Sequence, residues 1–255
     1  MKKLLSNLCV SWVLLVVATL KVTSLQAAEI KVAVAANFYK PVLTLVEHYQ
    51  KETGHHVQVS AGSTGKLYAQ IKNGAPFEVF LAADQQRPSL LVEEGLAEPE
   101  SQFTYALGSL VLWSNNPELV DGKGEILKEE LTHIAICNPK TAPYGAAAVS
   151  AMKNLGVYNK LEPKFVEGQS VGQTYQQISS GAVDLGFVAL SQVLVDKQLN
   201  GGSLWLVPNE LYSPIKQDAV LLKQGSNNAA AKQFLAYLQT EQSKQLIKDF
   251  GYDLK

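Results

Sequence analysis

Apolar runs of strand length alternate with helix-like segments along this chain. Glu29 to Ala35, His56 to Ser60 and Glu78 to Ala82 have the length and composition of buried strands, and a helix-like segment follows each of them. The same alternation begins again after the strand-like run Leu107 to Ser114. A regular alternation of strands and helices predicts parallel α/β sheets, in which ligands gather at the carboxyl ends of the strands.

Two extended runs, near residues 108 and 218, join the two sets of elements, and neither contains a flexible linker. If both runs cross between domains, residues 29–108 and 218–255 form lobe I and residues 109–217 form lobe II. Two lobes joined by two crossing strands make a hinge, and a ligand that contacts both lobes favours closure. The predicted fold class is therefore α/β, with two α/β lobes joined by a two-strand hinge.

A stretch rich in glycine and hydroxyl groups, Ser60-Ala61-Gly62-Ser63-Thr64-Gly65-Lys66-Leu67, lies between a predicted strand and a predicted helix. The first N–H groups of a helix have no partner within it, and the helix dipole adds a positive potential, so such a junction can bind an oxyanion without a charged side chain. The stretch fails the P-loop pattern at Ser60 and Leu67. An ordinary turn with a hydroxyl N-cap remains an open alternative.

Other strand-to-helix junctions carry similar groups. Asn37 follows the first predicted strand, at a helix start, where its side chain either caps the helix or faces a ligand. In the second set, Thr141 to Gly145 and Gly168 to Gly172 lie at helix starts and can present backbone N–H groups. If the lobes face each other, these junctions bring four helix starts around one anion.

The first residues are typical of a signal peptide. Met1-Lys2-Lys3 is basic, Leu8 to Leu20 is apolar, and Leu25 to Ala28 offers small residues for cleavage. A transmembrane anchor is the alternative, but the apolar run is shorter than the roughly 20 residues that a membrane span needs. We therefore expect a signal peptide over residues 1–28 and export to the periplasm.

Charge and cysteine content narrow the possible partners. Removal of the signal peptide takes away three of the 22 basic residues, Lys2, Lys3 and Lys21, and leaves 23 acidic ones, so the mature formal charge is −4. This balance argues against a nucleic-acid partner. Arg87 is the only arginine, so an oxyanion site would have to use backbone N–H groups and hydroxyls. Only Cys137 remains, so packing must hold the fold without an internal disulfide.

Five segments, in order along the mature chain, resemble the periplasmic molybdate-binding proteins of ABC importers. They are Ala33 to Asn37, Ser60 to Leu67, Asn73 to Asp84, Asn138-Pro139 with Pro143-Tyr144-Gly145, and Asp184 to Val188. The resemblance implies a type II periplasmic-binding-protein fold and a monomer that is not an enzyme. It also implies capture of molybdate, and of tungstate, for delivery to an inner-membrane ABC permease. No cofactor is implied, and the only metal is the one within the oxyanion.

The resemblance further implies which residues bind the oxyanion. Asn37 matches the contact at the end of the first strand, and Ser63 and Thr64 match the hydroxyl and N–H of the glycine-rich loop. In the second lobe, Tyr144 and Val171 match two backbone donors.

One position departs from the family pattern. Some members use a tyrosine hydroxyl at the end of the Leu-Gly-x-Val strand, where this sequence has Ala189. Either the phenol of Tyr144 replaces that donor or the site makes one hydrogen bond fewer.

Two other functions stay open. Sulfate or another smaller tetrahedral oxyanion offers the same acceptors as molybdate, so discrimination would rest on cavity size. An enzyme could use the Ser63-Thr64 loop on a phosphoester, but the sequence offers no general base and no metal ligands near the loop. No catalytic residue is therefore predicted.

Overall fold

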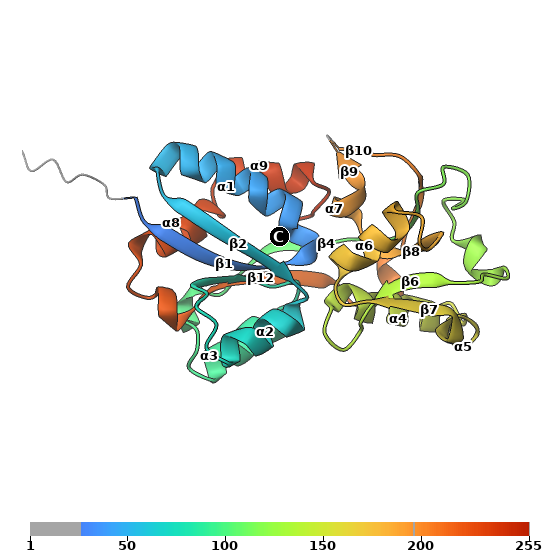
Figure 1. Ribbon diagram of the computed structural model, residues 1–255, viewed down its shortest axis with the longest axis horizontal. Coiled ribbons are helices and arrows are strands. Elements are labelled where there is room, and N and C mark those ends of the chain that lie inside the picture. Colours follow the sequence, from blue (N-terminus) through green and yellow to red (C-terminus); the bar gives the residue numbers. More distant parts are fainter. Residues whose placement is uncertain (1–26, 196, 255) are drawn as a thin grey trace, which may run out of the picture.

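The computed structural model describes residues 27–195 and 197–254, and the predicted signal peptide lies almost wholly outside these ranges. Two α/β lobes lie side by side along the longest axis, each built on a five-stranded sheet (Figure 1). The two-lobe α/β fold class predicted from the sequence is confirmed. Within the described ranges, no helix has both the length and the apolar character needed to cross a bilayer.

The sheet of lobe I has the strand order β2-β1-β3-β12-β4 and is covered on both faces. Val32 and Val34 of β1 pack in one apolar layer with α1, α8 and α9, whereas Ala33 packs in another with α2 and α3 (Figure 1). This alternation explains why β1 is apolar throughout, because both of its faces are buried. The elements are β1 (Glu29–Ala35), η1 (Ala36–Phe38), α1 (Tyr39–Thr53), β2 (His56–Gly62), α2 (Thr64–Lys72), β3 (Val79–Leu81), α3 (Gln86–Glu93), η2 (Pro99–Ser101), β4 (Phe103–Gly108), β12 (Ile215–Leu221), η6 (Lys223–Gly225), α8 (Ala229–Tyr237) and α9 (Glu241–Asp249).

The sheet of lobe II has the order β11-β5-β8-β6-β7 and a single large apolar core. Helices α4 and α6 pack against it, and α7, which the short pair β9 and β10 follows, contacts α1 of lobe I (Figure 1). The elements are β5 (Leu110–Ser114), η3 (Glu125–Lys128), β6 (Ile134–Cys137), α4 (Pro143–Asn154), α5 (Tyr158–Leu161), η4 (Glu162–Lys164), β7 (Phe165–Gly168), α6 (Val171–Ser179), β8 (Leu185–Ala189), α7 (Leu190–Val193), β9 (Leu194–Val195), β10 (Gln198–Leu199), β11 (Ser203–Leu206) and η5 (Asn209–Leu211).

Both sheets are mixed rather than wholly parallel, which corrects the expectation from the alternating pattern. Strand β12 runs antiparallel to β3, and β5 runs antiparallel to β8. These are the strands through which the chain enters each lobe from the hinge. They start at the edge where the parallel strands end, so they must run in the opposite direction. The entry strands therefore bring the hinge to the edge of each sheet at which its parallel strands end.

The chain crosses between the lobes on adjacent strands. Strand β4 ends at Gly108 and β5 begins at Leu110, so the run expected as one strand is two, in different sheets. The chain returns through β12, which begins at Ile215. The exact lobe boundaries, 108/109 and 217/218, stay a prediction. Leu107 and Asp253 also exchange backbone hydrogen bonds of 2.8 and 3.1 Å, which hold the C-terminal segment beside the hinge.

Candidate functional site

The residues expected to bind the oxyanion line one small cavity between the lobes. Each of the five is at most 4% exposed. The volume of the cavity is only about 10 Å³, so it suits a compact ligand rather than an extended one. Its full lining is Ala35, Ala36, Asn37, Gly62, Ser63, Thr64, Ala83, Ala142, Pro143, Tyr144 and Val171.

Four helix starts surround this cavity. Helices η1 and α2 begin at Ala36 and Thr64 in lobe I, and α4 and α6 begin at Pro143 and Val171 in lobe II. The first N–H groups of each helix have no acceptor within that helix, and the dipoles place positive potential at the same end. Proline has no N–H, so Tyr144 is the first donor of α4. The arrangement can stabilise an anion from both lobes.

The hydroxyl of Ser63 provides the most direct evidence for a ligand. Ser63 is 4% exposed, and its Oγ atom is buried without a hydrogen-bond partner among the residues described. It occupies the N-cap position of α2 but makes no side-chain cap bond. The ordinary capping turn is therefore not what the structure contains. A buried hydroxyl without a partner costs about 1–3 kcal/mol, so this group is explained if a ligand accepts its hydrogen bond.

Thr64 makes one hydrogen bond and keeps a second capacity. Its Oγ1 accepts from the backbone N–H of Ala83 at 3.0 Å, which ties the start of α2 to the end of β3. Because a hydroxyl that accepts a hydrogen bond still has its own proton to donate, Thr64 can both hold the loop and contact a ligand.

The side chain of Asn37 bonds at the hinge instead of capping a helix. It makes no cap bond to η1 or α1. Its Nδ2 atom donates instead to Gln217 Oε1 at 2.8 Å and to the Tyr252 hydroxyl at 2.9 Å, both buried. Asn37 lies at the start of η1, where the backbone N–H groups have no acceptor within the helix. Its backbone, rather than its side-chain amide, can therefore donate to a ligand in the cavity.

The Tyr144 phenol faces the hinge. It accepts a hydrogen bond of 3.3 Å from Gln217 Nε2, and a Cβ atom added to Gly108 would lie 2.1 Å from it. Burial raises the pKa of this phenol well above its ordinary value, and the nearby Tyr252 and Tyr105 raise it further, so it stays neutral. Since the phenol lies at the hinge beside Gly108 and Gln217, we assign the backbone N–H of Tyr144, rather than its hydroxyl, to the cavity.

Sequence reasoning missed Gln217 and Tyr252, which hold the site residues from behind. Both are buried, with exposed fractions of 0% and 3%. One weak indication in the sequence that Gln217 has a special role is that it is a polar residue at the start of an apolar strand. Nothing in the sequence indicated what it contacts. Tyr252 lies near the end of the chain, and only the fold brings it to Asn37.

The lobes contact each other around the cavity. The N–H of Gly65 donates to the Thr141 carbonyl at 2.8 Å, and Lys66 Nζ donates to Gln169 Oε1 at 2.5 Å. Arg87 Nη2 reaches the Lys140 carbonyl at 3.2 Å. These contacts join α2 and α3 of lobe I to the loops of lobe II beside the cavity.

A family model described as "Bacterial extracellular solute-binding protein" matches residues 30–253. The chain belongs to this family. This solute-binding protein is 52% identical to the molybdate-binding protein ModA of Rhodobacter capsulatus, over 89% of this chain and 88% of that one. It is 51% identical to the molybdate-binding protein ModA of Azotobacter vinelandii, over 90% and 92%. The solved periplasmic molybdate-binding protein of A. vinelandii superposes with a TM-score of 0.86 at 44% identity, covering 89% of this chain and 99% of that one.

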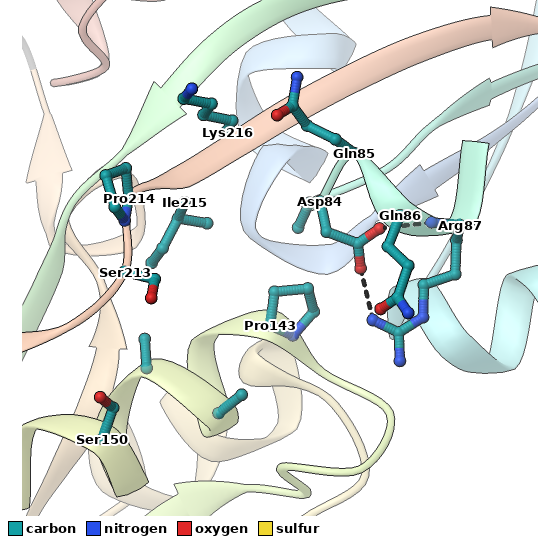
Figure 2. A pocket seen from close by; sticks show the side chains of 13 residues that line it. Asp84, Gln85, Gln86, Arg87, Pro143, Ser150, Ser213, Pro214, Ile215 and Lys216 are labelled. Carbon is teal, nitrogen blue, oxygen red and sulfur yellow. Dashed lines mark hydrogen bonds and ion pairs between the residues drawn. The ribbon is translucent and has the colours of Figure 1, made fainter. Parts of the chain in front are cut away.

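The solute-binding protein has a second, wider pocket on the other side of Ala83 and Pro143, with a volume of about 350 Å³ (Figure 2). The only arginine lies there. Arg87 Nη1 pairs with Asp84 Oδ2 at 2.6 Å, and Asp84 Oδ1 also accepts from the Arg87 N–H at 2.9 Å. Figure 2 shows this pair at one side of the pocket, with Lys216 directed away from it. The guanidinium charge is thus neutralised outside the small cavity, whose own lining is entirely neutral.

Proposed function

We propose that this protein captures molybdate, and also tungstate, in the cavity between its lobes and delivers it to an ABC permease of the inner membrane. The buried, unpaired hydroxyl of Ser63, surrounded by four helix starts, carries the proposal. The two relatives at 51–52% identity are molybdate-binding proteins, which supports molybdate as the ligand. The neutral lining supports it too, because N–H and O–H groups donate to an anion without competing carboxylates.

The proposed donors are backbone N–H groups near Asn37, Tyr144 and Val171 and the hydroxyls of Ser63 and Thr64. A hydrogen bond to a charged acceptor contributes about 1.5–3 kcal/mol, and the desolvation of a dianion and the closure of two lobes offset much of the sum. The Tyr144 phenol lies at the hinge, beside Gly108 and Gln217, so we propose that it does not replace the donor missing at Ala189. The site then makes one hydrogen bond fewer than in family members with the tyrosine.

The same proposal includes the location of the protein and its oligomeric state. Residues 1–28 direct export to the periplasm and are removed, and the mature protein acts as a monomer without a cofactor. We propose that it acts as a binding protein rather than an enzyme, as its relatives at 51–52% identity do.

Isothermal titration calorimetry of the mature protein with molybdate, tungstate, sulfate and phosphate tests this function. We expect tight binding of molybdate and tungstate, one ion per chain, and no heat from sulfate or phosphate. Sulfate binding as tight as molybdate binding would establish the general oxyanion binder instead. Turnover of a phosphoester would establish the enzyme.

A further inference from the structure

A network of buried, uncharged polar side chains lies at the hinge, directly behind the oxyanion cavity. Gln217 is its centre and is fully buried on β12, next to a register shift in the pairing with β4. Asn37, Tyr105, Tyr144 and Tyr252 surround it, each at most 4% exposed. Buried polar groups of this kind are costly unless every one has a partner, so the exact contacts of the network matter.

The amide of Gln217 joins the two lobes. Its Oε1 accepts from Asn37 Nδ2 at 2.8 Å and from the Tyr105 hydroxyl at 3.1 Å, and both donors belong to lobe I. Its Nε2 donates to the Tyr144 hydroxyl at 3.3 Å, and Tyr144 lies on α4 of lobe II. One side chain on a hinge strand thus contacts one predicted oxyanion-binding residue from each lobe.

The other hinge strand is shaped around this contact. A Cβ atom at Gly108, where β4 ends, would lie 2.1 Å from the Tyr144 hydroxyl and 2.6 Å from Gln217 Nε2. Real Cβ atoms do not approach other atoms so closely. Only glycine therefore lets the end of β4 lie this close to the hydrogen bond between Gln217 and Tyr144. The two strands that connect the lobes, β4 and β12, therefore both lie at the same hydrogen bond.

Of the three hydrogen bonds of Gln217, only the one to Tyr144 spans the lobes. A rotation about the hinge would leave the contacts with Asn37 and Tyr105 within lobe I and would separate Gln217 from Tyr144. We infer that Gln217 is a positioning residue for the anion site: its bond to Tyr144 stabilises the closed arrangement in which η1 and α4 present their N–H groups to one ion. This role rests on the proposed molybdate function.

The test compares two glutamine variants of the mature protein. Gln217→Met keeps the length of the side chain and removes the amide. Gln102→Met is the matched control, since the Gln102 amide bonds only to groups of lobe I: Asp218 Oδ2 at 2.8 Å, Ser89 Oγ at 3.0 Å and the Gln85 carbonyl at 3.4 Å. Molybdate affinity, its dissociation rate and the thermal midpoint without ligand are measured for each.

We expect Gln217→Met to bind molybdate about three- to tenfold more weakly, the range of one neutral hydrogen bond, mainly through faster dissociation. The control should lose thermal stability but keep its affinity. Tyr144→Phe is a second route, because it removes the phenol and keeps the backbone donor. It should weaken binding to a similar extent, and the double variant should lose less than the two single losses together.

The outcomes separate the two proposals. If wild-type protein ignores molybdate, both the function and the positioning role are wrong. If wild type binds molybdate and Gln217→Met and Tyr144→Phe bind it equally well, only the positioning role is overturned. An equal loss of affinity in Gln102→Met would also overturn it, because the effect would then follow from general destabilisation.

Discussion

Ser63 is the residue at which, under the proposed function, stability and binding conflict. Its hydroxyl is buried and has no partner within the described chain, so the folded protein bears a desolvation cost that a bound anion would relieve. Functional sites often contain such locally unfavourable groups. The position of Ser63 in a glycine-rich junction was visible in the sequence, whereas its lack of a partner was not.

For Ser63→Ala we expect molybdate affinity to fall about 10- to 100-fold, the equivalent of one hydrogen bond to a charged acceptor. The free energy of unfolding without ligand should stay the same or rise, because the variant buries no unpaired hydroxyl. Calorimetric titration and urea denaturation measure the two quantities.

Ser203→Ala is the matched control for that prediction. The Ser203 hydroxyl is also buried, but it donates to the Asn116 carbonyl at 2.6 Å and accepts from the Val120 N–H at 2.9 Å. Its removal should lower the free energy of unfolding by about 1–3 kcal/mol and leave affinity unchanged. If Ser63→Ala behaved like Ser203→Ala in both measurements, Ser63 would be a structural residue only.

At the scale of the element, helix α2 shows how local geometry and lobe closure are linked. Gly65 lies in its first turn, and the Gly65 N–H donates across the interlobe boundary to Thr141. A Cβ atom at Gly65 would lie 3.0 Å from both the Cα and the carbonyl oxygen of Thr141. Glycine is needed here because lobe II approaches the backbone closely, and not because of the local turn.

Gly65→Ala should therefore weaken molybdate binding about tenfold or more, since overpacking at such a contact costs about 1–3 kcal/mol. Unfolding of the ligand-free protein should be unaffected or slightly harder, because alanine is the better helix former. Titration and thermal denaturation of the variant provide the check.

Gly74→Ala gives the opposite pattern and serves as its control. Gly74 follows α2 with a φ of 83°, and nothing lies within 4 Å of a Cβ atom placed there. Alanine at this left-handed position should lower thermal stability without changing affinity. Unchanged affinity in Gly65→Ala would mean that ligand binding does not require the close approach of α2 to Thr141.

Strand order also belongs to this scale. The apolar runs and glycine-rich turns predicted most strands and helices, because periodicity and turn residues act locally. They did not predict that β12 and β5 run opposite to their neighbours, since that direction depends on where the hinge lies. The single run expected from Leu107 to Ser114 divides between two sheets for the same reason.

At the scale of the whole molecule, the hinge buries three phenols together. Tyr105, Tyr144 and Tyr252 are at most 4% exposed, and burial, the largest cause for each, raises their pKa values above the ordinary 10.0. The folded chain thus favours neutral phenols. Their contribution to stability is fully present below the unfolded pKa, near 10, and is lost as the pH rises above it.

We therefore expect the free energy of unfolding to fall steeply above about pH 10, where unfolded tyrosines ionise. The three buried phenols should ionise only as the chain unfolds. Tyrosinate absorbance and circular dichroism, followed together during an alkaline titration, measure this. Ionisation of all tyrosines in one phase while the native dichroism persists would contradict it.

The sequence by itself determined the alternation of strands and helices, the neutral character of the proposed anion site and the junctions proposed to supply its donors. These properties arise within a few residues: unpaired N–H groups belong to any helix start, and the scarcity of arginine leaves few alternatives. Tertiary structure decided which junctions meet, that the Asn37 side chain turns to the hinge, and that Gln217 lies between the lobes. Asn37 and Gln217 are 180 positions apart, and no local pattern specifies a contact that exists only after both lobes have folded and closed.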